Sequence, residues 1–220
     1  NLEKEVAQEI KEAYYATTTF VDAQIGRILK KLKRTGLDKN TIVVFTSDHG
    51  YHLGEHGHWQ KQTLFENSTR VPLIFSGPGI PSGVSSNSPV ELIDIYPTLT
   101  EITKIETPSH VVGKSLVPIF NDNNFKVRES ALTRWKASQN NKEFEGYSIK
   151  TERYRVTKWG ENGEDGFELY DHSNDPEEML NLANNINYKI ILDSLKLHLD
   201  LRIKDAMKKP PGLGPQFEER

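Results

Sequence analysis

The sequence contains no cysteine among its 220 residues. It therefore cannot form a disulfide, build a cysteine-based zinc site or use a thiol of its own as a nucleophile. It also lacks an excess of charge of either sign, because 28 Lys and Arg residues face 31 Asp and Glu residues and the formal net charge is −3. A protein that binds nucleic acid through charge carries a basic excess or a basic stripe, so this class is excluded.

Long apolar runs are missing as well. A membrane-spanning helix needs about 18 or more apolar residues in succession, whereas the longest runs here, such as residues 41–45, have the length of one buried strand. The sequence predicts no membrane span. Only 35% of the residues are apolar, which suggests that part of the apolar surface has a partner. Because the chain begins at Asn1 without an initiator Met or a leader, we expect a processed or trimmed piece.

The first half of the sequence alternates between helical and strand patterns. Apolar residues recur every three or four positions over residues 3–35, followed by Gly36, and this spacing predicts one long helix. Residues 41–46 are β-branched and apolar without alternation, which is typical of a doubly buried central strand in a parallel sheet. Residues 71–76 predict the next strand, and residues 90–102 predict a helix interrupted or restarted near Pro97. This order indicates an α/β sandwich.

The second half has a different character. Residues 131–135, 147–159 and 167–170 predict strands of an antiparallel sheet, and the apolar stripe from Tyr188 to Ile203 predicts a final helix. We therefore expect two parts. Residues 1–106 would complete a large α/β sheet, and residues 107–220 would form a smaller α+β subdomain with an antiparallel sheet and a long helix.

The loop after the first predicted strand concentrates the residues suited to catalysis. Asp48 and His49 stand at the carboxyl end of the strand, where open α/β sheets place their ligands. A carboxylate beside an imidazole can share a divalent cation if other ligands come from elsewhere. Lys61 supplies a positive charge suited to an anion held against that metal. Together these residues predict a pocket for a phosphate-like or sulfate-like group.

Histidine clustering favours this functional interpretation over a simple turn capped by the Asp–His pair. Four of the seven histidines lie within this loop, at His49, His52, His56 and His58. Tyr51 could line a sugar subsite by stacking or could only pack within the loop, and His58 leaves the same two alternatives open. Basic residues of the predicted strands could bind an anionic glycan or form a solvated strand face; they are Arg134, Lys136, Arg153, Arg155 and Lys158.

Several separate motifs resemble the second half of type I sulfatases, which belong to the alkaline phosphatase superfamily. These motifs are particularly similar to the corresponding motifs of iduronate-2-sulfatase-like polysaccharide sulfatases. The stretches that carry the resemblance are Thr46-Ser47-Asp48-His49-Gly50, Leu53-Gly54-Glu55-His56-Gly57 with Trp59 and Lys61, residues 70–74, the preceding helix around residues 14–26, Asp94-Ile95-Tyr96-Pro97-Thr98-Leu99, and Leu169-Tyr170-Asp171 with residues 175–182.

The resemblance implies roles for individual residues. Asp48 and His49 would complete a Ca²⁺ site, and Lys61 would contact the sulfate. The nucleophile of such enzymes is a formylglycine, made from Cys or Ser in a C/S-x-P-x-R motif of the N-terminal half, and this sequence does not contain that motif. We therefore expect the C-terminal portion of a sulfatase acting on sulfated sugars or polysaccharides. The N-terminal portion of the same sulfatase would be its partner, and the chain alone would be inactive. Family analogy implies an exported protein, either periplasmic, extracellular or lysosomal.

Two alternatives stay open at this point. A two-metal phosphatase or phosphodiesterase of the same superfamily also uses an Asp–His pair at a strand end, and His52, His56 or His58 could then bind the second metal. Lys61 and the flanking motifs favour the sulfatase. The other alternative is a non-catalytic protein that binds a sulfated glycan without hydrolysing it.

Overall fold

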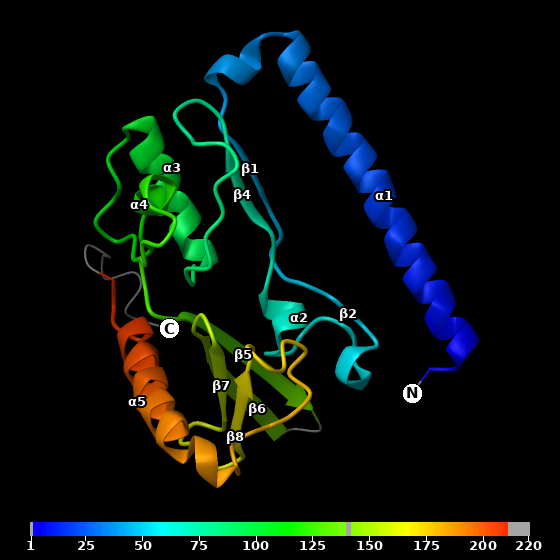
Figure 1. Cartoon of the computed structure of the whole chain (residues 1–220), viewed down its shortest axis with the longest axis vertical. Helices are drawn as coiled ribbons and strands as arrows, with labels where there is room; N and C mark the ends of the chain where they lie inside the picture. The colour runs from blue at the N-terminus through cyan, green and yellow to red at the C-terminus, as the bar shows by residue number, and fades with distance from the viewer. Residues whose placement is uncertain (1, 140–141, 211–220) are drawn as a thin grey trace. The chain divides into compact units, whose positions relative to one another are not determined.

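The computed structural model describes residues 2–139 and 142–210 (Figure 1). The chain divides after Ser82 into two compact units, which we describe separately. The predicted boundary between residues 106 and 107 stays a prediction. Within the described residues, no helix is both long and apolar enough to cross a bilayer.

The first unit combines one long helix with two short antiparallel ladders (Figure 1). In chain order its elements are α1 (Lys4–Arg34), the 3-10 helix η1 (Leu37–Asn40), β1 (Val43–Thr46), β2 (His52–Leu53), the 3-10 helix η2 (Glu55–Gly57), β3 (Trp59–Gln60), α2 (Glu66–Thr69) and β4 (Leu73–Ser76).

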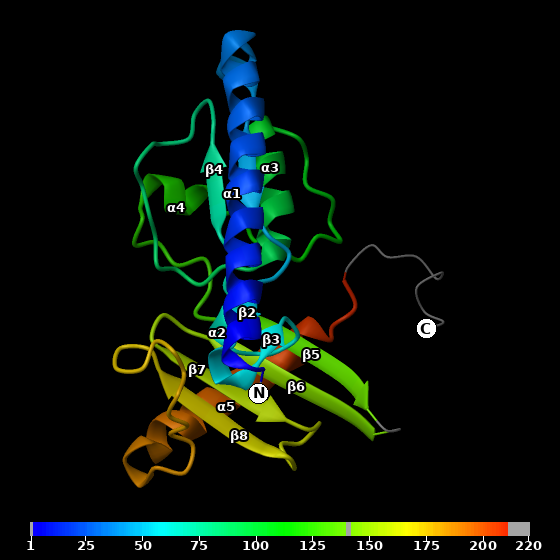
Figure 2. The ribbon, with the colours of Figure 1, turned by 90° about the vertical axis from the view of Figure 1, so that its right-hand side faces the viewer.

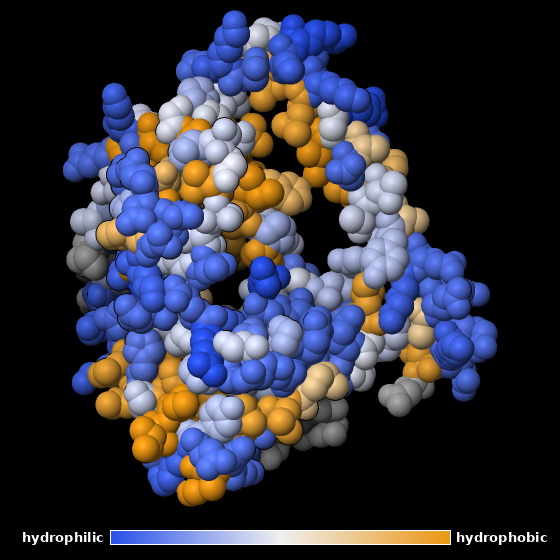
Figure 3. Space-filling model, viewed as in Figure 1, coloured by the Kyte–Doolittle hydropathy of each residue, from blue (hydrophilic) through white to orange (hydrophobic). Residues whose placement is uncertain are grey.

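Helix α1 confirms the predicted helix and its end. It is followed by Gly36, which adopts the left-handed conformation (φ 73°) that terminates many helices. Basic side chains in its last turn face the negative end of the helix dipole. No residue of α1 is buried, and Figure 3 shows apolar side chains at the surface along it. The predicted apolar face therefore exists but has no core packed on it in the described chain.

Strands β1 and β4 confirm the predicted strand positions, but the expectation that residues 41–46 belong to a parallel sheet is wrong for this pair of strands. The two strands run antiparallel, with Val43 opposite Ser76 and Thr46 opposite Leu73. Burial on both faces is also wrong, since the residues of β1 are half-buried or exposed. A doubly buried strand needs layers on both faces of its sheet, and β1 and β4 form a two-stranded sheet in the described chain.

The second unit contains an antiparallel sheet of strand order β5-β6-β7-β8 with a helix against it (Figure 2). In chain order its elements are the 3-10 helix η3 (Leu92–Asp94), α3 (Ile95–Thr103), α4 (Val117–Asn121), β5 (Ala131–Gln139), β6 (Lys142–Lys150), β7 (Tyr154–Trp159), β8 (Gly166–Asp171), the 3-10 helix η4 (Ile186–Tyr188) and α5 (Lys189–Ala206).

The antiparallel sheet and the final helix are confirmed, with one correction. Residues 147–159 are not one strand, because a turn separates β6 from β7. Thr151 closes this turn: its backbone N–H donates to the Tyr154 carbonyl, and its hydroxyl oxygen accepts from the Tyr154 N–H, both at 2.8 Å. The core lies between the sheet and α5, where alternate strand residues meet the apolar stripe of the helix; its buried members are Tyr147, Ile149, Val156, Leu169, Leu182, Leu192 and Leu199.

The helical segment around Pro97 is also confirmed, because η3 ends at Asp94 and α3 begins at Ile95. The fully buried Asp94 carboxylate accepts from the backbone N–H groups of Glu91 and Lys114, each at 2.8 Å. It also pairs with Arg128. Asp94, the first residue of the Asp94–Leu99 motif, therefore has a structural role. Its buried carboxylate is stabilised by several hydrogen-bond donors, as a buried charge requires.

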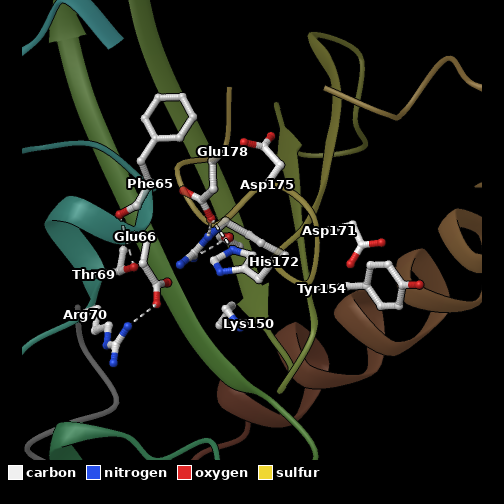
Figure 4. Close-up of polar contacts among 12 residues, drawn as sticks. Phe65, Glu66, Thr69, Arg70, Lys150, Tyr154, Asp171, His172, Asp175 and Glu178 are labelled. Atoms are coloured by element: carbon white, nitrogen blue, oxygen red, sulfur yellow. Dashed lines mark hydrogen bonds and ion pairs between the residues drawn. The ribbon is translucent and has the colours of Figure 1, made fainter. Parts of the chain in front are cut away.

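The motif after β8 has a structural role as well. Glu178 is buried and pairs with Arg155, and His172 lies 2.8 Å from the same carboxylate. Figure 4 shows His172 and Glu178 pointing toward one another. The side-chain oxygen of Asn181 accepts from the backbone N–H of Leu169 at 3.0 Å. These contacts fasten the segment beyond β8 to the sheet.

Candidate active site

The candidate site lies in the loop that follows β1. The Ser47 hydroxyl donates to the His49 carbonyl at 2.8 Å, and the Asp48 Oδ1 atom accepts from the His49 backbone N–H at 3.1 Å. Both side chains thus fold the chain back on itself directly after the strand, as Ser and Asp do in tight turns. The turn places Asp48 and His49 side by side at the strand end.

Gly50 holds this turn against α2. Its N–H donates to the Ser68 carbonyl at 2.8 Å. A Cβ atom at this position would lie 1.9 Å from the Asn67 carbonyl oxygen, a separation that no side chain tolerates. The close approach of two backbones is therefore possible only because residue 50 is glycine.

The Gly50 carbonyl also fixes the tautomer of His49. The His49 Nδ1 atom lies 2.8 Å from this oxygen. Because a carbonyl only accepts, Nδ1 carries the proton and Nε2 of the neutral ring presents its lone pair. The Lys61 ammonium donates to this lone pair over 2.7 Å, and the Asp48 Oδ2 atom lies 3.4 Å from it. The three residues singled out in the sequence therefore meet at one ring nitrogen.

The electrostatics suit the binding of a cation. The Asp48 side chain is 84% exposed, and that of His49 is 33% exposed. Desolvation acts to raise the pKa of the Asp48 carboxyl, but two backbone N–H groups and the Lys61 ammonium hold this pKa below its ordinary value. Asp48 is therefore ionised at neutral pH.

These donors fit one side of a divalent cation site. A carboxylate oxygen and an imidazole lone pair close together offer two ligand atoms from adjacent residues. A Ca²⁺ ion takes 6–8 ligands, mostly oxygen, so other groups must complete the shell. The Lys61 ammonium has three N–H donors, and its single bond to His49 leaves two for an anion.

The other loop histidines lie away from this meeting point. His52 is fully buried and its Nε2 atom is 2.7 Å from the Thr63 hydroxyl. That hydroxyl donates its own proton to Ser68, so the His52 Nε2–H is the donor. His56 stacks flat on Phe65 with the ring centroids 3.9 Å apart. Among the described residues, no group of three potential metal ligands includes His49, and the second-metal alternative stays a prediction.

Burial lowers the pKa of His52, and the neighbouring His58 and His56 act in the same direction against the opposing effect of Glu55. Its Nδ1 atom is buried without a hydrogen-bond partner among the described residues. His52 is therefore a neutral core residue. Its bond to Thr63 could not be predicted from the sequence, because the two residues meet only through the folded loop.

Tyr51 and His58 occupy different settings. The Tyr51 ring lies 5.1 Å from the ring of Tyr14 on α1, so it packs against the helix. The exposed His58 lies 5.7 Å from the His52 ring, centroid to centroid. Within the described part of the chain, neither residue is hydrogen-bonded to Asp48, His49 or Lys61, and their roles toward a sugar stay predictions.

The basic residues of the second unit do not form a free anion-binding face. Each pairs with a carboxylate, as shown by the pairs Arg134–Glu145 (2.5 Å), Lys136–Glu143 (2.9 Å), Arg153–Asp171 (2.7 Å), Arg155–Glu178 and Lys158–Asp200 (2.8 Å). These partners offset the positive charge that a sulfated glycan would need.

Two family models match the chain. The model described as "N-sulphoglucosamine sulphohydrolase, C-terminal" matches residues 54–205, and the model described as "Sulfatase" matches residues 2–105. A sulfatase from Formosa agariphila is 38% identical over 189 residues, and the alignment covers 86% of this chain and 35% of that protein. The chain thus spans about a third of the length of the curated relatives it matches.

Solved structures are similar as well. A 2-O GAG sulfatase superimposes with a TM-score of 0.83 and 30% identity, covering 92% of this chain and 44% of that one. A phosphonate monoester hydrolase from Silicibacter pomeroyi gives a TM-score of 0.82 with 26% identity, covering 95% of this chain and 44% of that one. These likenesses confirm the predicted mixed α/β fold.

Proposed function

This chain belongs to the sulfatase family, and from that premise we propose that it supplies metal and sulfate ligands to an enzyme that hydrolyses sulfate esters of sugars or polysaccharides. The observation that carries the proposal is the meeting of Lys61 Nζ and Asp48 Oδ2 at His49 Nε2. The likeness to a 2-O GAG sulfatase supports a sulfated glycan as the substrate class.

Each residue has a definite task in this proposal. Asp48 and His49 would hold Ca²⁺ together with ligands from outside these 220 residues. The bound ion would supply positive charge to neutralise sulfate oxygens. Lys61 would donate its remaining N–H groups to the sulfate and stabilise the charge that develops in the transition state. Tyr51 and His58 would contact the sugar.

The nucleophile would be a formylglycine in a segment outside this sequence, because the chain has no cysteine and no C/S-x-P-x-R motif. A longer polypeptide or a partner chain would provide it. The substrate would then lie between the nucleophile and the loop that carries Asp48, His49 and Lys61.

The proposal is tested by variants of the complete gene product. Asp48→Ala removes a metal ligand and Lys61→Met removes the ammonium, and each is expected to lower sulfate release by about 100-fold or more. A chelator should abolish turnover and added Ca²⁺ should restore it. The measurement is release of sulfate from a sulfated disaccharide and from an aryl sulfate.

Matched controls are available in η1, where Asp38 and Lys39 are exposed and lie outside the site. Asp38→Ala and Lys39→Met remove the same charges and should leave turnover near that of the unaltered enzyme. Full activity in Asp48→Ala, with metal dependence unchanged, would refute the assignment.

The similarity to a phosphonate monoester hydrolase supports a second candidate. An enzyme of this kind would prefer a phosphonate or phosphate ester over the sulfate ester of the same alcohol. Comparing kcat/KM for 4-nitrophenyl sulfate, phosphate and phenylphosphonate separates the two, and metal analysis should find one calcium per sulfatase site. A preference for the phosphonate together with two bound transition metals would favour the alternative.

A further inference from the structure

The Lys61 ammonium and a bound metal ion would compete for one lone pair, that of His49 Nε2. Nε2 of His49 presents a single lone pair, because Nδ1 carries the proton that it donates to the Gly50 carbonyl. The Lys61 ammonium donates to that lone pair at 2.7 Å. A metal ion bound by His49 would need the same electron pair, and one lone pair cannot serve both.

We propose that the Lys61 ammonium is an internal cation of the Asp48–His49 pair, which a divalent metal must displace before Lys61 can bind an anion. The inference rests on the proposed function, since it takes Asp48 and His49 as metal ligands. It adds an order of assembly, in which the metal binds first and the anion second.

Geometry decides which partner moves. His49 is held by its Nδ1–H bond to the backbone, and the backbone of Gly50 is in turn fixed to Ser68. Lys61 is exposed and its charge sits at the end of a flexible four-carbon stem. The lysine therefore swings away while the imidazole stays in place.

Displacement has a consequence for anion binding. Away from His49, all three N–H donors of Lys61 become available to an anion. An anion that holds Lys61 also removes a competing positive charge from the metal ligands. Metal and anion binding are therefore positively coupled, and by linkage each strengthens the other by the same factor.

The test uses the 220-residue chain with ¹⁵N-labelled histidine. Long-range ¹H–¹⁵N spectra report the tautomer and the metal binding of the His49 ring itself, and Zn²⁺ serves as the probe because imidazole binds it well. We expect Lys61→Met to bind Zn²⁺ at His49 about three- to tenfold more tightly than the unaltered chain at low ionic strength, because a competitor and a repelling charge are removed.

Two further variants control for other causes. Lys39→Met removes an exposed lysine outside the site and should leave the Zn²⁺ affinity unchanged. Lys61→Arg keeps a cationic donor and should stay close to the unaltered chain. Thermal melting of each variant shows whether the fold is retained, which is expected because Lys61 is exposed.

The outcomes separate this inference from the proposed function. If His49 binds Zn²⁺ equally or more weakly in Lys61→Met, the competition is refuted while the metal site stands. If Zn²⁺ at millimolar concentration leaves the His49 resonances unchanged in both chains, the inference is refuted. The Ca²⁺ site of the complete protein, which has further ligands, is then judged separately by the Asp48→Ala variant of the complete gene product. A sulfate titration in the presence of Zn²⁺ should bind more tightly than one without it, and equal affinities would contradict the coupling.

Discussion

At the scale of single residues, the loop contains histidines with opposite properties. His49 is partly exposed, and its Nε2 lone pair faces a carboxylate and an ammonium. His52 is fully buried, and its Nε2–H donates to the Thr63 hydroxyl. The first is suited to bind a ligand, while the second fastens the loop from inside. The chemistry of an imidazole here follows from its hydrogen-bond partners and burial.

The buried His52 predicts a pH-dependent stability. Its pKa is lowered in the folded chain, so the unfolded chain binds more protons once the pH falls below the ordinary histidine value of about 6.5. The contribution of His52 to the free energy of unfolding is complete above that value and is lost as the pH falls toward its folded pKa. Urea unfolding between about pH 7.5 and 5 should show falling stability, and NMR titration of the His52 ring should give a pKa below 6.5.

A variant isolates His52 from other titrating groups. His52→Gln keeps an N–H donor for Thr63 but does not titrate, so its stability should depend less steeply on pH. His110→Gln removes an exposed histidine and should leave the slope unchanged. A His52 ring that titrates at or above the ordinary value would contradict the prediction.

At the scale of secondary-structure elements, the site depends on how its loop meets α2. Gly50 joins the two through its bond to Ser68 and through a close approach to the Asn67 carbonyl. The same residue orients His49 through its own carbonyl. A contact between two elements therefore sets the orientation of a ligand side chain.

A pair of glycine variants tests this contact. Gly50→Ala would place Cβ 1.9 Å from a backbone oxygen, so the loop and α2 must separate, at a cost of about 2 kcal/mol or more in the free energy of unfolding. Gly26→Ala in α1 meets nothing within 4 Å and should stabilise the chain by about 0.5–1 kcal/mol. Urea unfolding measures both. Equal effects of the two substitutions would show that the close approach has no energetic role.

The same elements show what a sequence reveals about a fold. Helix α1 could be predicted because its spacing and Gly36 are local signals. The antiparallel pairing of β1 with β4 could not, because an apolar run indicates burial but carries no information on the direction of the neighbouring strand. The turn between β6 and β7 escaped prediction because residues 151–153 contain no Gly, Pro or Asn, and the Thr151 side chain closes it instead.

At the scale of the whole molecule, the two units differ in what holds them together. The second unit has an apolar core between its sheet and α5, reinforced by the buried carboxylates of Asp94 and Glu178. The first unit carries the candidate site, yet its long helix buries no residue. The motif residues Asp48, His49 and Lys61 could be predicted from the sequence. Their shared contact at His49 Nε2 could not, since it requires the Gly50 carbonyl and the folded loop.

The division of the proposed site between this chain and other residues predicts its behaviour in isolation. The purified 220-residue chain has Asp48, His49 and Lys61 but neither a cysteine nor a C/S-x-P-x-R motif, so it should bind metal at His49 without hydrolysing 4-nitrocatechol sulfate. The complete gene product should hydrolyse it, because the aldehyde-derived nucleophile and the preorganised charges must act on the same sulfur. The assay compares both proteins at equal concentration with and without Ca²⁺. Turnover by the 220-residue chain that is lost in Asp48→Ala would show that the nucleophile lies within this sequence, and the proposed division would then be wrong.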